Sequence, residues 1–335
     1  MAGPGRETAG ALDVARLARR ALHGLLLLFG VSLLSFVLVE LAPGDYFAEM
    51  RLDPRISEAT VRGLRARYGL DRPLPQRYLG WLASLARGEL GYSFAYGGPV
   101  GPLLWPRARN TVLLTATATA VAWLLAVPLG VWWATLRGGP AAHGLAGLTA
   151  FLLALPDLVL ALGLLLLAVR TGWFPTGGMV SLGHEHMSWG AQVKDVASHL
   201  TLPVSALVLG LLPVLVRHVR ASVADALRAP FVHAARAHGI PERRVLFRHA
   251  LPAAANPLIS LFGLSLAGLL SMSLVVEVVM SWPGLGPLLL EAILARDFHL
   301  VLGPVLVSTV LLVGGNLLAD LLLRAADPRI RAEGE

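Results

Sequence analysis

Six long apolar stretches constrain this chain more than any other feature of its sequence. They cover residues 22–41, 110–136, 144–170, 200–217, 252–280 and 301–323. A helix of about 20 residues spans roughly 30 Å, the thickness of the hydrocarbon core of a bilayer. Charged residues make up only 15% of the chain and hydrophobic residues 56%, which argues against a water-soluble enzyme. Because a segment in lipid must satisfy its backbone internally, we predict an all-α integral membrane protein with six transmembrane helices.

The distribution of arginine and lysine predicts the orientation of these helices. With the N-terminus inside, the inner segments carry fifteen basic residues and the two short outer loops carry three. Basic residues concentrate in cytoplasmic loops, so both termini are predicted to be cytoplasmic. Residues 1–21 then form a cytoplasmic segment, 22–41 the first transmembrane helix and 42–108 a long extracytoplasmic loop. A cleaved secretory signal is the alternative for 22–41, but the apolar region of such signals is usually shorter, about 7–15 residues.

Residue types and motifs that the chain lacks exclude several kinds of functional site. The chain has no cysteine, which excludes disulfides and thiolate metal sites. Its single lysine, Lys194, lies in the sequence Ala-Gln-Val-Lys-Asp, whereas a Walker A phosphate loop requires Gly-Lys followed by Ser or Thr. The His-Glu-x-x-His pattern of zinc proteases is also absent, and we predict neither catalytic residues nor a cofactor. If ATP drives this protein, another subunit supplies the ATPase.

The longest inner loop, residues 217–251, has an unusual pattern of proline and glycine. Pro230 suits the first position of a helix that continues over residues 231–238, and Gly239 suits a left-handed residue at the end of that helix. The same proline-first pattern predicts a second short helix over residues 242–249.

Small side chains on the first of these helices suggest a role for the loop. Ala234, Ala235 and Ala237 would let another surface approach the backbone closely. Docking of a cytoplasmic partner is one interpretation. A basic connector that simply follows the charge bias of inner loops is the other.

The same loop resembles a known motif. His233-Ala-Ala-Arg-Ala-His-Gly239, nine residues and then His249-Ala-Leu251-Pro252 resemble the EAA loop of ATP-binding-cassette (ABC) importer permeases, E-A-A-x-x-x-G, nine residues and I-x-L-P. His233 and His249 depart from the family's Glu and Ile. Further segments resemble the dipeptide/oligopeptide/nickel branch: Tyr68–Pro75, Gly88–Ser93, Glu277–Gly286, Arg296–Phe298, Asn316–Asp320 and Asp327–Arg331. The resemblance covers about residues 20–331 and is greatest to the first of the two paired permeases, the one with the long outer loop.

This resemblance implies a fold, partners and a site. The fold would be that of a type I ABC importer permease, with a core transmembrane permease domain over residues 109–331 in a prokaryotic plasma membrane. The partners would be a second homologous permease subunit, two ATP-binding ATPase subunits, an extracytoplasmic solute-binding protein and the lipid bilayer, with no nucleic acid. The cargo would be peptides or a related small solute such as a nickel chelate. The implied ATPase-coupling residues are Phe231, His233, Ala234, Ala235, Arg236, Gly239, Leu251 and Pro252.

Two acidic residues in apolar stretches are candidates for the translocation pathway or gate. Asp157 follows Pro156 near the middle of the third stretch, and Glu277 lies near the outer end of the fifth. A charge at the centre of a bilayer costs about 2.5–3.5 kcal/mol on insertion scales, so such a residue is expected to face a partner or a wet path. For Asp157, which could also lie at a subunit interface, the alternative is a structural hydrogen bond near the proline break. For Glu277 the alternative to the gate is the subunit interface.

The sequence also allows a metal site and a second class of transporter. His184-Glu185-His186, with His199 nearby, makes a metal site in an outer loop conceivable, but residues two apart do not share a helix face, and we assign no metal. A secondary transporter not driven by ATP is the alternative function, because six helices with buried carboxylates suit one. The inverted hydropathy repeat typical of such transporters is not evident.

Overall fold

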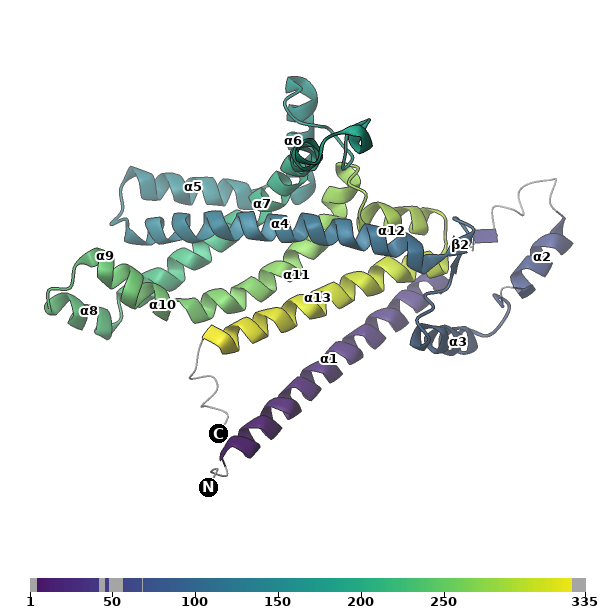
Figure 1. The fold of residues 1–335 in the computed structure, drawn as a ribbon, viewed down its shortest axis with the longest axis horizontal. Helices are drawn as coiled ribbons and strands as arrows, with labels where there is room; N and C mark the ends of the chain where they lie inside the picture. Colours follow the sequence, from purple (N-terminus) through teal and green to yellow (C-terminus); the bar gives the residue numbers. More distant parts are fainter. Residues whose placement is uncertain (1–4, 42–45, 48–56, 68, 327–335) are drawn as a thin grey trace. The chain divides into compact units, whose positions relative to one another are not determined.

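The structure is a computed structural model that describes residues 5–41, 46–47, 57–67 and 69–326 (Figure 1). The chain divides into two compact units. Unit 1 comprises Met1–Ala18, Val112–Trp282 and Leu312–Glu335, and unit 2 comprises Arg19–Thr111 and Pro283–Leu311. Three long helices contribute to both units: α1 (Gly5–Leu41), α4 (Val100–Thr135) and α13 (Phe298–Ala326).

Unit 1 is organised around one long helix, α7. Its elements, besides parts of α4 and α13, are α5 (Pro140–Ala154), α6 (Asp157–Thr171), a short 3₁₀ turn (His184–His186), α7 (Trp189–Leu227), α8 (Pro230–Ala237), α9 (Glu242–Val245), a π turn (Leu246–Ala250), α10 (Leu251–Ala253) and α11 (Ala255–Val279). Helices α5, α6 and α11 all pack against α7. Pro203 and Pro213 lie buried inside α7 and do not end it, as expected where neighbouring helices compensate for the lost backbone hydrogen bonds.

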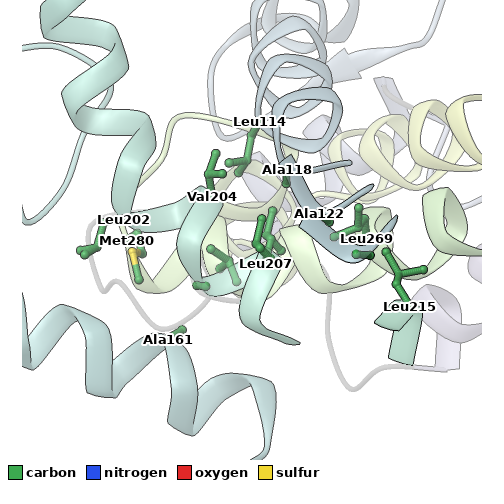
Figure 2. Packing of buried hydrophobic residues seen from close by; sticks show 14 of the residues in the cluster. Leu114, Ala118, Ala122, Ala161, Leu202, Val204, Leu207, Leu215, Leu269 and Met280 are labelled. Carbon is green, nitrogen blue, oxygen red and sulfur yellow. The ribbon is translucent and has the colours of Figure 1, made fainter. Parts of the chain in front are cut away.

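Buried side chains at intervals of four residues, mostly alanines, place one face of α4 against this centre. Leu114, Ala118 and Ala122 are fully buried on one face of α4, and Figure 2 shows them gathered with Leu207 of α7 and Leu269 of α11. Membrane helices gain little from apolar burial against lipid, so they associate through close packing of small residues. The alanines of α4 therefore set the distance between these helices.

The third predicted span is wrong as a single helix. The stretch 144–170 consists of α5 and α6, which meet at an angle of 100°. Leu155 and Pro156 between them are extended, with ψ angles of 125° and 140°, because proline disfavours the α conformation in the residue before it and lacks an N–H of its own. Each half has 15 residues, roughly 22 Å of helix, which is less than the hydrocarbon thickness.

The other five apolar stretches are each confirmed as one helix long and apolar enough to cross a membrane. The fourth is longer than predicted, because α7 continues to Leu227 where the sequence suggested an end at residue 217. Arg217 and Arg220 therefore belong to α7, and the inner loop begins at Arg228. Arg220 lies over the ring of Trp133, 4.3 Å from its centroid, and this cation–π contact offsets part of the cost of a cation on the helix.

Unit 2 combines the long loop after α1 with the segment before the last helix. Its elements, besides parts of α1, α4 and α13, are α2 (Glu58–Arg67), α3 (Leu74–Ala86), a hairpin of β1 (Tyr92–Ser93) and β2 (Gly98–Pro99), and α12 (Leu285–Leu294). The two strands are antiparallel, with Tyr92 opposite Pro99. This hairpin is a small exception to the all-α prediction.

Aromatic packing and one buried carboxylate hold unit 2 together. Phe36 of α1 packs edge-on against Phe298 of α13 and Tyr78 of α3, with ring centroids 4.4 and 5.1 Å apart. Asp297 is completely buried and accepts hydrogen bonds from the Ser93 hydroxyl (2.7 Å) and the Ala95 N–H (2.9 Å). It also accepts one from the Leu300 N–H, so it caps the start of α13 while fixing the hairpin.

A close approach of α4 to α7 in unit 1, at Gly130, gives a first prediction. A Cβ added to Gly130 would lie 2.6 Å from Val219 Cβ and 3.0 Å from the Val216 carbonyl oxygen. We expect Gly130→Leu to destabilise the chain by about 1–3 kcal/mol, because the helices must separate to admit the side chain. Thermal unfolding of the detergent-solubilised chain measures this effect. Gly147→Leu on α5 is the matched control, since nothing lies within 4 Å of its added Cβ. Equal unfolding midpoints for the two variants would contradict this packing.

Candidate functional site

Helix α8 begins and ends as the sequence predicts. Ala229 is extended, Pro230 takes the first helical position, and Gly239 has a φ of +75°. The Gly239 N–H donates to the Arg236 carbonyl (2.9 Å), and the Ile240 N–H donates to the Ala235 carbonyl (3.2 Å). These two bonds make a Schellman motif, which requires a left-handed residue that glycine adopts most readily. The turn after α8 is therefore fixed by backbone hydrogen bonds.

The loop has a small apolar core of its own. Val232 and Ala235 on α8 pack with Val245 on α9 and Ala250 in the π turn, and all four are buried. Ala226 and Leu227 at the end of α7 pack against this cluster and also against a second cluster that includes Leu258 of α11. The loop is thereby joined to the ends of α7 and α11 by continuous side-chain contact.

This core divides the predicted coupling residues into two groups. Phe231, His233 and Ala234 are exposed, as docking to a partner requires. Ala235 is different: its side chain is buried in the loop's own core and does not face outward as the sequence suggested. The reason is helical geometry, because Ala235 lies three residues after Val232 and shares its inward face.

An ion pair links α8 to α9. Arg236 Nε donates to Glu242 Oε1 at 2.8 Å and Nη2 donates to Oε2 at 3.1 Å. This two-pronged arrangement matches the planar guanidinium to the carboxylate. The hydrogen bonds from Arg236 lower the pKa of Glu242 below its ordinary value of 4.5. A further contact from Arg236 Nη1 to the Leu227 carbonyl oxygen, at 3.4 Å, reaches back to α7. The sequence pattern predicted a role for Arg236 but none for Glu242, which lies six residues further on across a proline turn.

The second helix of the loop is shorter than predicted. We expected a helix over residues 242–249, whereas α9 ends at Val245 and a π turn covers Leu246–Ala250. Pro252 accounts for the wider turn, because a proline ring in a regular α-helix collides with the carbonyl four residues earlier. Leu251 is half-buried and Pro252 is exposed at the start of α10, next to α11.

The two acidic candidates differ in their surroundings. Asp157 is exposed at the first position of α6, where the helix dipole favours a negative charge. Its Oδ1 would lie 3.0 Å from a Cβ added to Gly210, so the carboxylate lies close against α7. Glu277 is completely buried in α11. Only Asp157 therefore faces open space in this structure.

The outer histidines gather around a residue that sequence reasoning missed. Asp195 Oδ2 lies 2.7 Å from His184 Nδ1 and also accepts the Ser181 N–H, while Oδ1 lies 3.4 Å from His199 Nδ1. His186 takes no part. In the part of the chain that the structure describes, no three such side chains could hold a metal ion. The cluster instead fastens the 181–186 turn to the start of α7, and the i,i+4 spacing of Asp195 and His199 was the available signal.

Known proteins match this chain over most of its length. Residues 126–332 match the family described as "Binding-protein-dependent transport system inner membrane component". The oligopeptide transport system permease protein AppB of Bacillus subtilis (strain 168) is 37% identical, covering 94% of this chain and 99% of AppB. The dipeptide transport system permease protein DppB of Escherichia coli (strain K12) is 33% identical, covering 90% and 94%.

A solved structure has a similar fold. It is the MetNI methionine ABC transporter in inward-facing conformations, with a TM-score of 0.55 over 67% of this chain and 96% of that chain, at 17% identity. The apolar helices, the fold and the relatives agree on a multi-pass protein of the bacterial inner membrane. The chain therefore belongs to the family of binding-protein-dependent transport system inner membrane components, the permease subunits of ABC importers.

Proposed function

We propose that this chain is the permease subunit that forms half of a peptide pathway in an ABC importer. The main support is the self-supporting α8 loop, which presents Phe231, His233 and Ala234 outward in the segment predicted to be cytoplasmic. The substrate class rests on relatives such as AppB and DppB, whose names specify oligopeptides and dipeptides and which align with at least 90% of the chain.

The proposed assembly follows from the family and the charge bias. ABC importer permeases work with ATPase and binding-protein subunits in general. In our proposal a second homologous permease completes the pathway, two ATPase subunits lie on the cytoplasmic side, and an extracytoplasmic protein delivers the peptide. Both termini of this chain and its α8 loop are cytoplasmic, in accordance with the fifteen basic residues of the inner segments.

Coupling in this proposal is mechanical. ATP binding closes the ATPase pair and displaces α8. In this proposal α8 and α9 move together, because the Schellman turn, the Arg236–Glu242 pair and the apolar core join them. The displacement of α8 therefore reaches the end of α7 and is not lost as a change of shape within the loop. Ala226 and Leu227 belong to the packing of both the loop and the α7–α11 contact, so they carry the motion to those helices.

Within the pathway we assign the two carboxylates different roles. Asp157 is the better candidate for contact with cargo or water, since it is exposed and adjacent to α7. Glu277 is the better candidate for a gate that operates when α11 moves, since burial now separates it from solvent. Because the chain belongs to a family of binding-protein-dependent importers, the alternative function, a secondary transporter not driven by ATP, has no support.

The turn after α8 gives a test of coupling. Gly239→Pro should abolish peptide-stimulated ATPase activity of the assembled importer, because proline cannot adopt φ near +75° and cannot donate the bond to Arg236. Gly172→Pro is the control: Gly172 ends α6 with φ of +67°, and its N–H donates to the Ala168 carbonyl oxygen four residues earlier, but it lies outside the loop. ATPase assays on the reconstituted complex measure both.

The comparison separates folding from coupling. Both variants should insert and assemble, with similar losses of stability, and only the Gly239 variant should lose stimulation by the loaded binding protein. Retained stimulation in an assembled Gly239→Pro complex would remove the role proposed for α8.

The Arg236–Glu242 pair makes a prediction about pH. Because the folded pKa of Glu242 lies below 4.5, the pairing contributes stability above that value and is lost as the pH falls through the folded pKa. The Glu242 carboxylate therefore keeps its charge between about pH 6 and about pH 8, and the contribution of this ion pair to coupling should not change over that range. Glu242→Gln should weaken coupling across that range, and the exchanged pair Arg236→Glu with Glu242→Arg should partly restore it.

Asp225→Asn is the control for the loss of one negative charge, since Asp225 is exposed near the end of α7 and makes no ion pair within the described residues. Equal effects of Glu242→Gln and Asp225→Asn would show that only net charge matters. ATPase stimulation and transport rates at each pH supply the measurement.

The substrate class has its own test. Proteoliposomes that contain this chain with its partner subunits should accumulate a radiolabelled tripeptide in an ATP-dependent manner. Unlabelled peptides should compete, whereas nickel–histidine complexes and sugars should not. Competition by sugars alone would leave the ABC permease assignment intact and refute the peptide assignment.

A further inference from the structure

Unit 2 contains a pocket of about 200 Å³ that has no part in the proposed coupling or pathway. It lies between the turn before α3, the first turns of α3 and the start of α13. Arg72, Gln76 and Arg77 form its polar wall, and Trp81 and Phe298 form apolar walls. The pocket belongs to the long outer loop, whose nine basic residues have no role in coupling.

Charge favours an anion in this pocket. Within the described part of the chain no acidic side chain lines it, and Arg72 makes no ion pair. Arg77 is largely buried, is held by Glu40 at 2.7 Å, and lies over the rings of Phe36 and Phe298. The Glu40 charge offsets that of Arg77, so an excess of one positive charge remains, carried by the exposed guanidinium of Arg72.

One donor beside the pocket has no hydrogen-bond partner. Trp81 is 5% exposed, and its Nε1–H has no partner in the part of unit 2 that the structure describes. Buried polar groups in folded proteins are rarely left without a partner. This N–H is shielded from solvent, so a ligand oxygen reaches it only when the neighbouring side chains shift slightly.

The ligand chemistry follows from these features. One excess positive charge suits a monovalent anion, and a guanidinium binds the two coplanar oxygens of a carboxylate in parallel. The apolar walls of Trp81 and Phe298 suit a carbon-bearing group more than an inorganic ion. We propose that this pocket is a binding site for the carboxylate of a peptide or protein ligand, with Arg72 as the main charge partner. The site itself does not depend on the proposed function; only the assignment of the pocket to the outer face rests on the proposed orientation.

The test uses the full chain in lipid nanodiscs without ATPase subunits. The probes are N-acetyl-Ala-Ala, which has a terminal carboxylate, N-acetyl-Glu-amide, which has only a side-chain carboxylate, and uncharged N-acetyl-Ala-Ala-amide. Isothermal titration calorimetry measures affinity.

The ¹⁵N-indole resonance of Trp81, assigned with Trp81→Phe, reports contact at the pocket. We expect at least one carboxylate probe to bind and shift this resonance, and the uncharged amide to do neither. The preferred probe identifies the source as a chain terminus or an acidic side chain.

Variants connect binding to the pocket. Arg72→Gln should weaken binding by about tenfold or more, as the loss of a charge-assisted bond implies. Arg72 is exposed, so the fold should persist. Arg87→Gln is the matched control, because Arg87 is an exposed arginine at the end of α3 that does not line the pocket. The proposal is overturned if no carboxylate probe binds, if Arg72→Gln binds as well as the parent chain, or if inorganic phosphate binds more tightly than both carboxylates. If the parent chain binds a carboxylate probe but the proteoliposomes described above do not accumulate peptide, the result counts against the proposed function and leaves the binding site intact.

Discussion

Backbone hydrogen bonding inside the bilayer, where no water is present, is the constraint on which this structure depends. Each N–H and C=O group within hydrocarbon must find its partner inside the protein, so apolar stretches become helices before any side chain is considered. Side chains then decide how the helices meet. The alanines of α4 and Gly130 allow close approach to α7, where a larger residue would hold the helices apart.

The loop around α8 solves a different problem. It is the longest inner connection, and outside lipid it needs its own apolar contacts to hold a shape. Val232, Ala235, Val245 and Ala250 supply those contacts with few atoms. The Schellman turn and the Arg236–Glu242 pair add directional restraints that a small core lacks. Because Ala226 and Leu227 pack on both sides, the apolar core of the loop is continuous with the packing of the helices that it joins.

The sequence predicts features that local chemistry determines. Apolar length located the helices, and Pro230 with Gly239 located α8 and its turn. Context decides the rest. Pro156 breaks a helix whereas Pro203 and Pro213 do not, because neighbours compensate in α7 and no sequence signal reports those neighbours. Ala235 shares the inward face of Val232, but the core that it enters is completed by Val245 and Ala250, ten and fifteen residues further on. Asp297 reaches Ser93 across 204 positions of the chain, which periodicity cannot reveal.

The π turn at Leu246–Ala250 has a consequence for the helix register downstream. A π turn holds one more residue than an α turn, and one residue corresponds to about 100° of rotation and about 1.5 Å of rise. If that extra residue were taken up into regular helix, the segments that follow would rotate by this angle about their axis. Glu277 is completely buried in α11, 27 residues beyond the turn, so such a change of winding would alter which side chains of α11 meet its neighbours.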